Sequence, residues 1–315
     1  MSRRVRRSGL MMPINNARFV ALSWTRESDS LDYDLEDSVP QSQKEYARSL
    51  VRECLAIGRQ GGAQVSVRIN TATPEADIGA SIWPGLAFIS HPKTESAGQV
   101  QHIDALISRF ERERAVRPGT VDINAMIETA KGVANCYEIA SASPRIKAFA
   151  GGGGYDMSLD LGVEMFVGFD QFLYGRSECE FAARTLGLEF TVSVFLPDTA
   201  GSVSNTDHAY AQAVANRRAG GRGANGLHPN VVAPQVRGYT PPPEEVEEAR
   251  QILTFFREID QRGEVEDMLG DRLVDCYETA RARELIDWAA GCAEMDEHKA
   301  RMRAEALARQ AEVAG

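Results

Sequence analysis

Short apolar runs alternate with amphipathic segments along most of this chain, and this alternation restricts its possible folds more than any other feature. In the amphipathic segments 43–58, 96–115 and 206–220, apolar residues recur every three or four positions, which is the spacing of one helix face. The apolar runs read as β-strands at residues 9–13, 30–38, 64–70, 85–92, 121–129, 146–152, 189–197 and 224–229. Eight strands alternating with helices predict an α/β fold, the (β/α)8 TIM barrel, with a doubly wound open sheet as the alternative.

The chain is predicted to form a barrel core over residues 1–235 and a C-terminal helical extension over residues 236–315. Three consecutive prolines end one element, and the acidic run after them suits the positive end of the next helix. Residues 295–315 are rich in Ala, Arg and Glu and predict a further helix. We expect the extension to pack on the barrel and on a neighbouring subunit. Within the barrel, residues 71–85 hold two prolines and leave room for only a short helix.

Charge and cysteine content argue against several classes of protein. The net charge is −10, the opposite of what a nucleic-acid-binding protein needs to neutralise phosphates. No stretch approaches the ~20 apolar residues of a membrane span, and the basic N-terminal segment lacks the apolar core of a signal peptide. The five cysteines are scattered without a C-x-x-C pair, so neither a disulfide framework nor a zinc site is predicted. We expect a cytoplasmic protein.

Polar side chains follow the predicted strands at the edge where a TIM barrel carries its active site. Taken singly, a strand-end residue often faces solvent or caps the next helix, but here many strand ends carry compatible chemistry. The residues at these strand ends are Asp34, Glu36, Asp37, Arg68, Asn70, His91, Lys93, Glu95, Glu128, Asp156 and His228. A ring of carboxylates mixed with cationic side chains predicts a site for a divalent metal and an anionic ligand.

Glu128 and Asp156 are the candidate metal ligands because they follow adjacent predicted strands. Mg²⁺ commonly takes one or two carboxylates from the protein and leaves positions for water and substrate. A 2-oxo acid fills two such positions. Arg68 is the candidate partner for the substrate carboxylate, since a guanidinium binds a carboxylate in a planar fork.

The glycine run in "AFAGGGGYDMSLDLG", residues 148–162, resembles neither of the common phosphate-binding loops. It lacks both the G-x-G-x-x-G spacing and the Gly-Lys-Ser/Thr ending, and it lies in the middle of the chain. Glycines lack a Cβ atom, so Gly153 and Gly154 would let a ligand approach the backbone while the turn directs Asp156 inward. The alternative is a flexible turn without a ligand.

Six motifs, in order between residues 6 and 286, resemble the citrate lyase β-subunit-like family. They are "DLEDSV", "VRIN", "PKTES", "IETAKGVANCYEIASASPRI", "YDMSLDLG" and "LHP". Relatives in this family include malyl-CoA lyases, citramalyl-CoA lyases and malyl-CoA thioesterases. The resemblance implies a TIM barrel that assembles as a homotrimer or hexamer and uses Mg²⁺.

The resemblance also implies roles for individual residues. Glu128 and Asp156 would bind the metal, and Arg68 would hold the keto-acid carboxylate. The motif "LVDCYETARA" would supply Asp275, reaching in from a neighbouring subunit, as the acid/base of the acyl-CoA members. Further residues at the mouth would be Glu36, Asp37 and Lys93.

Four positions depart from the family pattern. Ile14 replaces a glycine, Ala224 replaces a lysine, His91 replaces an aliphatic residue and Tyr277 replaces a proline. These positions belong to the CoA groove and the entrance, whereas the metal and carboxylate residues are kept. The departures therefore put the CoA ester in question more than the metal chemistry.

The sequence leads to a first hypothesis of a Mg²⁺-dependent carbon–carbon lyase acting on a hydroxyacyl-CoA, such as malyl- or citramalyl-CoA, or on a related hydroxy acid. A CoA-independent aldolase is a close variant. A thioesterase of the malyl-CoA kind is the alternative enzyme. A subunit that works only within a citrate lyase-like complex is the alternative of another class.

Overall fold

The computed structural model describes residues 5–164, 170–192 and 203–314, which form two compact units. One unit contains Arg6–Tyr239 together with the chain from Lys299 onward, and the other contains Val5 and Thr240–His298. Within the described residues, no helix combines the length and apolarity that a membrane crossing requires.

The first unit is built around eight parallel strands. They are β1 (Ser8–Pro13), β2 (Ser30–Asp34), β3 (Gln64–Arg68), β4 (Leu86–His91), β5 (Asp122–Ile127), β6 (Ile146–Gly151), β7 (Glu189–Thr191) and β8 (Ala224–Gly226). Their order is β7-β6-β5-β4-β3-β2-β1-β8, and a parallel bridge between Val192 and Ala224 brings the two outer strands together. The sheet is therefore a nearly closed barrel, which confirms the predicted fold. The predicted strand 189–197 is described only as far as residue 192.

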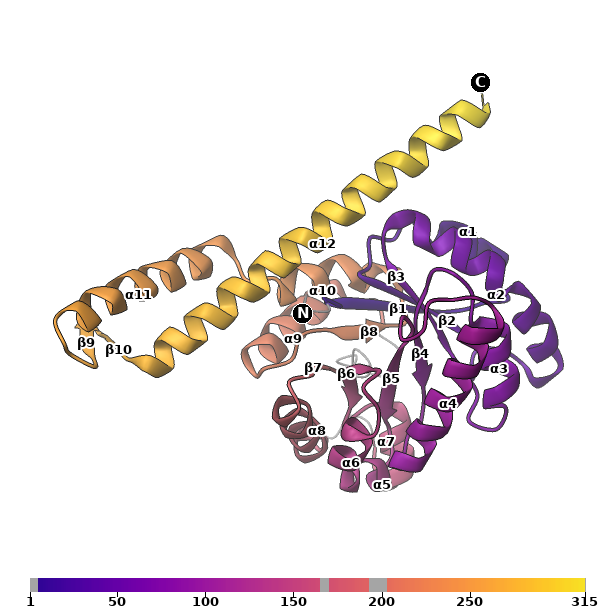
Figure 1. Cartoon of the computed structure of the whole chain (residues 1–315), viewed down its shortest axis with the longest axis horizontal. Helices are drawn as coiled ribbons and strands as arrows, with labels where there is room; N and C mark the ends of the chain where they lie inside the picture. Colours follow the sequence, from indigo (N-terminus) through magenta and orange to yellow (C-terminus); the bar gives the residue numbers. More distant parts are fainter. Residues whose placement is uncertain (1–4, 165–169, 193–202, 315) are drawn as a thin grey trace. The chain divides into compact units, whose positions relative to one another are not determined.

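Helices surround these strands (Figure 1). They are α1 (Ala17–Ser23), α2 (Lys44–Gly58), α3 (Pro74–Ser81), α4 (Ala97–Glu113), α5 (Ala130–Ala134), α6 (Cys136–Ser141), α7 (Tyr155–Leu161), α8 (Leu173–Thr185), α9 (Thr206–Arg218) and α10 (Val232–Tyr239), with 3-10 turns η1 (Gln41–Gln43), η2 (Arg59–Gly61) and η3 (Pro229–Val231). The segment 71–85 forms only the short α3, as its prolines predict. A capping box of Ser96 and Gln99 starts α4, so two free backbone N–H groups are satisfied there.

Successive strand residues point to opposite faces of the barrel wall. In β2, Leu31 and Tyr33 belong to the apolar core, whereas Asp32 lies on the other face. The carboxylate of Asp32 accepts hydrogen bonds from Ser66 Oγ at 2.9 Å and Ser90 Oγ at 2.7 Å, on the two next strands. The barrel interior below the mouth is therefore polar, and burial raises the pKa of Asp32 to about 6.

This buried carboxylate predicts a pH-dependent stability. The pKa of Asp32 in the folded protein lies above the ordinary value of 3.8. As pH rises, Asp32 therefore loses its proton at a lower pH in the unfolded chain than in the folded protein. The contribution of Asp32 to stability is therefore fully present below pH ~4 and is lost as pH rises through about 6, by roughly 2–3 kcal/mol. We expect Asp32→Asn to remove most of this fall, as measured by urea unfolding at pH 4.5, 6 and 7.5. The same pH dependence in both proteins would contradict the assignment to Asp32.

The second unit contains α11 (Pro243–Gln261), an antiparallel hairpin of β9 (Asp267–Leu269) and β10 (Arg272–Val274), and the first part of α12 (Cys276–Ala314). The sequence predicted helices in this region, and α11 and α12 confirm them. The helix predicted for the last residues is the continuation of α12, which runs for 39 residues. The hairpin was not predicted, because two strands of three residues each are too short to show a period.

Candidate active site

A cavity of about 400 Å³ opens at the barrel mouth. Its lining residues are Met11, Met12, Pro13, Asp34, Asp37, Ser38, Arg68, Met126, Glu128, Gly153, Gly154, Tyr155, Asp156 and Leu227. Seven of the residues named from the sequence thus share one cavity, and two more, Glu36 and Lys93, contact them. The cavity lies at the C-terminal ends of β2, β3 and β5, where a TIM barrel binds its ligands.

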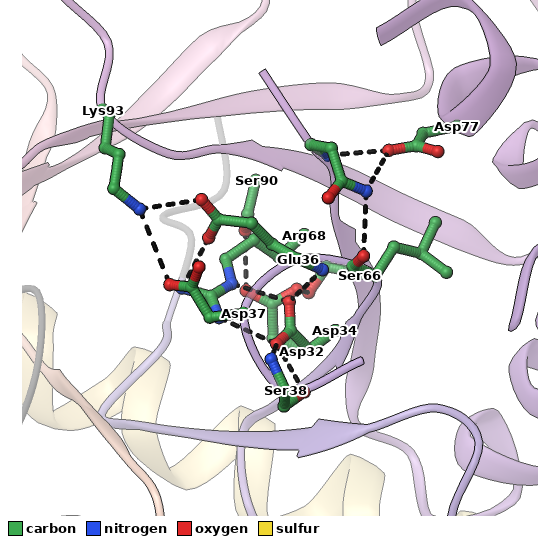
Figure 2. A network of polar contacts seen from close by, with 12 residues as sticks. Asp32, Asp34, Glu36, Asp37, Ser38, Ser66, Arg68, Asp77, Ser90 and Lys93 are labelled. Atoms are coloured by element: carbon green, nitrogen blue, oxygen red, sulfur yellow. Dashed lines mark hydrogen bonds and ion pairs between the residues drawn. The ribbon is translucent and has the colours of Figure 1, made fainter. Parts of the chain in front are cut away.

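Arg68 is held in place by Asp34, its neighbour in the register of β2 and β3. Arg68 Nε and Nη2 donate to the two carboxylate oxygens of Asp34 at 2.8 Å each, and both side chains are buried (Figure 2). Asp34 and Glu36 outweigh the effect of burial and keep the pKa of Arg68 above its usual range. The Nε–Nη2 edge of the guanidinium is therefore committed to Asp34, while Nη1 lies 3.0 Å from Glu36 Oε2.

Asp34 also organises the loop that follows β2. Its carboxylate accepts the backbone N–H groups of Glu36 at 2.8 Å and of Ser38 at 3.0 Å. Burial alone would raise the pKa of Asp34, but the hydrogen bonds and charge of Arg68 outweigh burial and lower it. The carboxylate thus stays ionised and fixes the loop that carries Glu36 and Asp37.

Glu36 lies between the two cationic side chains of the site. Its Oε2 atom is 3.0 Å from Arg68 Nη1, and its Oε1 atom accepts a hydrogen bond from Lys93 Nζ at 2.8 Å (Figure 2). Among the described residues, the buried Oε2 atom finds no hydrogen-bond partner of good geometry, and burial raises the pKa of Glu36. Asp37 is more exposed and lies 3.5 Å from Lys93 Nζ.

Glu128 and Asp156, the predicted metal ligands, both contact Lys93. The buried Glu128 accepts the backbone N–H of Lys93 at 3.0 Å, and Asp156 Oδ1 lies 3.1 Å from Lys93 Nζ. Burial and the charge of Asp156 raise the pKa of Glu128 to about 7, because two like charges oppose each other there. A bound cation would relieve this repulsion.

The number of carboxylates fits a hard divalent cation that keeps open positions. Among the residues that the structure describes, no group of three or more His, Cys, Asp or Glu side chains is arranged to enclose a metal. Mg²⁺ does not need such an enclosure, since it is commonly bound by one or two carboxylates together with water and substrate. The pair of Glu128 and Asp156 meets that requirement.

The glycine turn presents Asp156 at the start of α7. A Cβ atom on Gly152 would lie 2.4 Å from backbone atoms of Gly175 and Arg176, so only glycine allows this packing. Gly154 has φ +117°, a conformation that side chains disfavour, and it faces open space. The first two glycines after Ala150 thus serve packing, whereas Gly153 and Gly154 line the cavity.

Four strand-end residues named from the sequence serve the turns instead of the cavity. Asn70 donates to Leu35 O at 2.8 Å, and His91 Nδ1 lies 2.7 Å from Thr94 Oγ1. Burial lowers the pKa of His91 to about 4. The other two are Glu95, paired with Lys131, and His228, which caps η3.

Sequence reasoning missed the apolar wall of the cavity, which contains Met11, Met12, Pro13, Met126 and Leu227. Met126 precedes Glu128 by two positions, so strand alternation gave a signal for its inward direction. Two of the departures from the family pattern, Ile14 and Ala224, are buried at 1% and 5% exposure and are not part of the cavity lining.

Asp275 belongs to the second unit, between β10 and α12. Its Oδ1 atom accepts the backbone N–H groups of Tyr277 at 2.8 Å and Glu278 at 2.9 Å, so it caps the N-terminus of α12. Met268, Leu273 and Tyr277 nearby in the sequence have exposed side chains. The catalytic role of Asp275 stays a prediction.

The sequence of the chain is similar to those of known proteins. The HpcH/HpaI aldolase/citrate lyase family model matches residues 7–220. The chain is 29% identical to citrate lyase subunit beta of Leuconostoc mesenteroides subsp. cremoris, covering 91% of this chain and 94% of that protein. It is also 29% identical to L-malyl-CoA/beta-methylmalyl-CoA lyase of Cereibacter sphaeroides, covering 82% and 86%.

Solved structures share the fold. Protein CitE of Mycobacterium tuberculosis, crystallised with magnesium, acetoacetate and coenzyme A, superposes with a TM-score of 0.71. The match covers 91% of this chain and 98% of CitE at 22% identity. The matched residues include Arg68, Glu128 and Asp156. The chain therefore belongs to the HpcH/HpaI aldolase/citrate lyase family.

Proposed function

We propose that this chain is a Mg²⁺-dependent carbon–carbon lyase that cleaves or forms a hydroxyacyl-CoA such as malyl- or citramalyl-CoA, or a related hydroxy acid. One observation carries the proposal: Arg68, Glu128 and Asp156 line the same cavity at the barrel mouth. The names of the relatives, citrate lyase and malyl-CoA lyase subunits, support the same reaction class.

Glu128 and Asp156 would hold the metal, and the magnesium in the CitE crystal structure supports Mg²⁺ as the ion. Bound there, Mg²⁺ would polarise the oxygen of a 2-oxo or 2-hydroxy acid. Arg68 would orient the acid, because it lines the cavity while Asp34 fixes its Nε and Nη2 atoms. The apolar side of the cavity, which includes Met11, Met12 and Met126, would shield the reacting carbons from water.

In the cleavage direction, the bond between the carbinol carbon and the carbon next to the thioester breaks. The hydroxyl group loses its proton to solvent and becomes the keto group of the 2-oxo acid, while the electron pair of the broken bond stays on the carbon next to the thioester. The carbon released from the bond gains a proton and becomes the acyl methyl group. Asp275 of a neighbouring chain would deliver that proton as the general acid and remove it in the reverse reaction.

Arg68→Lys is expected to weaken binding of the acid strongly, although the charge is kept. Lysine lacks both the two nitrogens that Asp34 holds and the planar group that meets a carboxylate with two N–H donors. Losing one charge-assisted hydrogen bond costs ~1.5–3 kcal/mol, which is roughly tenfold or more in affinity. Calorimetric titration with pyruvate or oxalate in the presence of Mg²⁺ measures the change. A variant that binds both acids as well as the wild type would show that Arg68 is not the clamp.

Two other functions use the same site. A thioesterase would use water as the nucleophile and release free CoA, and a citrate lyase-like subunit would need a partner that carries the acyl group. The names of the citrate lyase relatives favour the second of these alternatives.

An assay of the purified chain alone separates these functions. Malyl-, citramalyl- and methylmalyl-CoA and the free hydroxy acids are each incubated with MgCl₂, and 2-oxo acid and free thiol are measured in parallel. A lyase releases 2-oxo acid without free thiol, and a thioesterase releases thiol without 2-oxo acid. If the chain alone releases neither product, and activity appears only when an acyl-carrier partner is added, the chain is a subunit of a complex.

A further inference from the structure

Among the contacts described at the site, only those of Lys93 reach both proposed metal ligands. Its backbone N–H donates to Glu128 Oε2 at 3.0 Å, while its Nζ atom lies 3.1 Å from Asp156 Oδ1. It does so from the turn after β4 with φ +48°, a conformation that few residues with a side chain adopt. The turn thus directs the N–H and the ammonium group toward two different carboxylates.

The ammonium group of Lys93 is surrounded by carboxylates from separate parts of the barrel mouth. Besides Asp156 on α7, it meets Glu36 Oε1 at 2.8 Å and Asp37 Oδ2 at 3.5 Å, both in the loop after β2 (Figure 2). The side chain is 32% exposed, so solvent screens these contacts only in part. Burial would lower the pKa of Lys93, but Glu36 and Asp156 outweigh it, and the group stays protonated.

The charges at the mouth do not balance. Two cations, Arg68 and Lys93, face five carboxylates, which are Asp34, Glu36, Asp37, Glu128 and Asp156. Arg68 contacts Asp34, Glu36 and Asp37, so among the described contacts it is Lys93 that supplies the positive charge next to Asp156. A divalent cation at Glu128 and Asp156 would compete with the ammonium for Asp156, since two cations repel at such distances.

We propose that Lys93 is the resident counter-cation of the metal site: it holds Asp156 while no metal is bound and gives up that contact when a divalent cation binds. The displaced ammonium stays on the Glu36 side and faces the anionic group of the incoming acid. Lys93 is thus a positioning residue that lowers metal affinity and raises acid affinity. This inference rests on the proposed function, because it takes Glu128 and Asp156 as the ligands.

Lys93→Met isolates the ammonium group. Methionine is unbranched and of similar length, and it keeps the backbone N–H that donates to Glu128. Like lysine, it has a side chain that must tolerate the positive φ of the turn. The variant should bind Mg²⁺ about tenfold more tightly, because a competing charge is removed from Asp156. It should bind oxalate, in saturating Mg²⁺, at least about fivefold more weakly, since a positive charge facing the acid is lost. A residue that merely supports the fold would move both affinities in the same direction.

Isothermal calorimetry with MgCl₂, and then with oxalate, tests the wild type, Lys93→Met, Lys93→Arg, Lys131→Met and Glu128→Gln. Lys131 pairs with Glu95 at 3.1 Å and is exposed, so Lys131→Met removes one positive charge away from the cavity and should change neither affinity. Lys93→Arg keeps the charge and should bind Mg²⁺ within about threefold of the wild type. If Lys93→Met does not fold, Lys93→Gln takes its place.

Opposite shifts of the two affinities in Lys93→Met, with unchanged Lys131→Met, support the inference. If Lys93→Met binds Mg²⁺ no more tightly than the wild type while Glu128→Gln loses Mg²⁺, the inference about Lys93 is wrong and the proposed metal site stands. If Glu128→Gln binds Mg²⁺ as the wild type does, the proposed metal site is wrong and the inference falls with it.

Discussion

Glu128→Gln and Asp156→Asn are each expected to abolish measurable Mg²⁺ binding and to reduce lyase activity by at least ~100-fold. Substituting a residue that only hydrogen-bonds to a metal ligand already lowers metal affinity or activity by about 10–100-fold. Each substitution removes one charged oxygen from a site that has only two proposed carboxylate ligands. Activity is measured across a range of MgCl₂ concentrations, and Mg²⁺ affinity is measured by calorimetry. Metal dependence that is unchanged in both variants would refute the assignment.

Unfolding provides the control for these variants. Burial and Asp156 raise the pKa of Glu128 to about 7, so its charged form costs stability above that pH in the metal-free protein. Replacing it by glutamine removes this cost, and we expect Glu128→Gln in EDTA at pH 8 to be at least as stable as the wild type. A loss of activity together with a lower melting temperature in EDTA would indicate a folding defect.

A mixture of two inactive variants, Asp275→Asn and Glu128→Gln, is expected to regain activity if Asp275 acts across a subunit boundary. We propose that the chain forms a homotrimer or hexamer in which one chain supplies Asp275 to the barrel of the next. After subunit exchange at equal amounts, a chain with an intact Glu128 meets a neighbour with an intact Asp275 at roughly a quarter of the interfaces of a symmetric ring. The expected recovery is therefore about a quarter of the wild-type activity.

The choice of asparagine protects the fold in this experiment. Asp275 caps α12 through the N–H groups of Tyr277 and Glu278, and asparagine caps a helix about as well as aspartate. The matched control mixes Glu128→Gln with Asp156→Asn, which damage the same barrel, so no mixed interface restores a complete site. No recovery in samples shown to contain mixed oligomers would mean that Asp275 serves its own barrel or has no catalytic role.

The sequence alone determined the barrel and most of the residues around its mouth. Strand alternation and helical spacing are local properties, so eight strands and the helices between them could be predicted without knowing any contact. The active-site edge followed from the fold, because parallel strands end together. This is why Arg68, Glu128 and Asp156 could be named in advance and now lie in one cavity.

Other features were decided only by the tertiary structure. Asp34 and Arg68 are 34 positions apart, and only the register of β2 against β3 pairs them and commits one edge of the guanidinium to the protein. The contacts of Lys93 with Glu36, Asp37 and Asp156 depend on a turn with positive φ and on the meeting of two distant loops. Local periodicity gives the face on which a side chain lies, but not the partner that it meets there. That partner is set by packing between segments that are far apart in the chain.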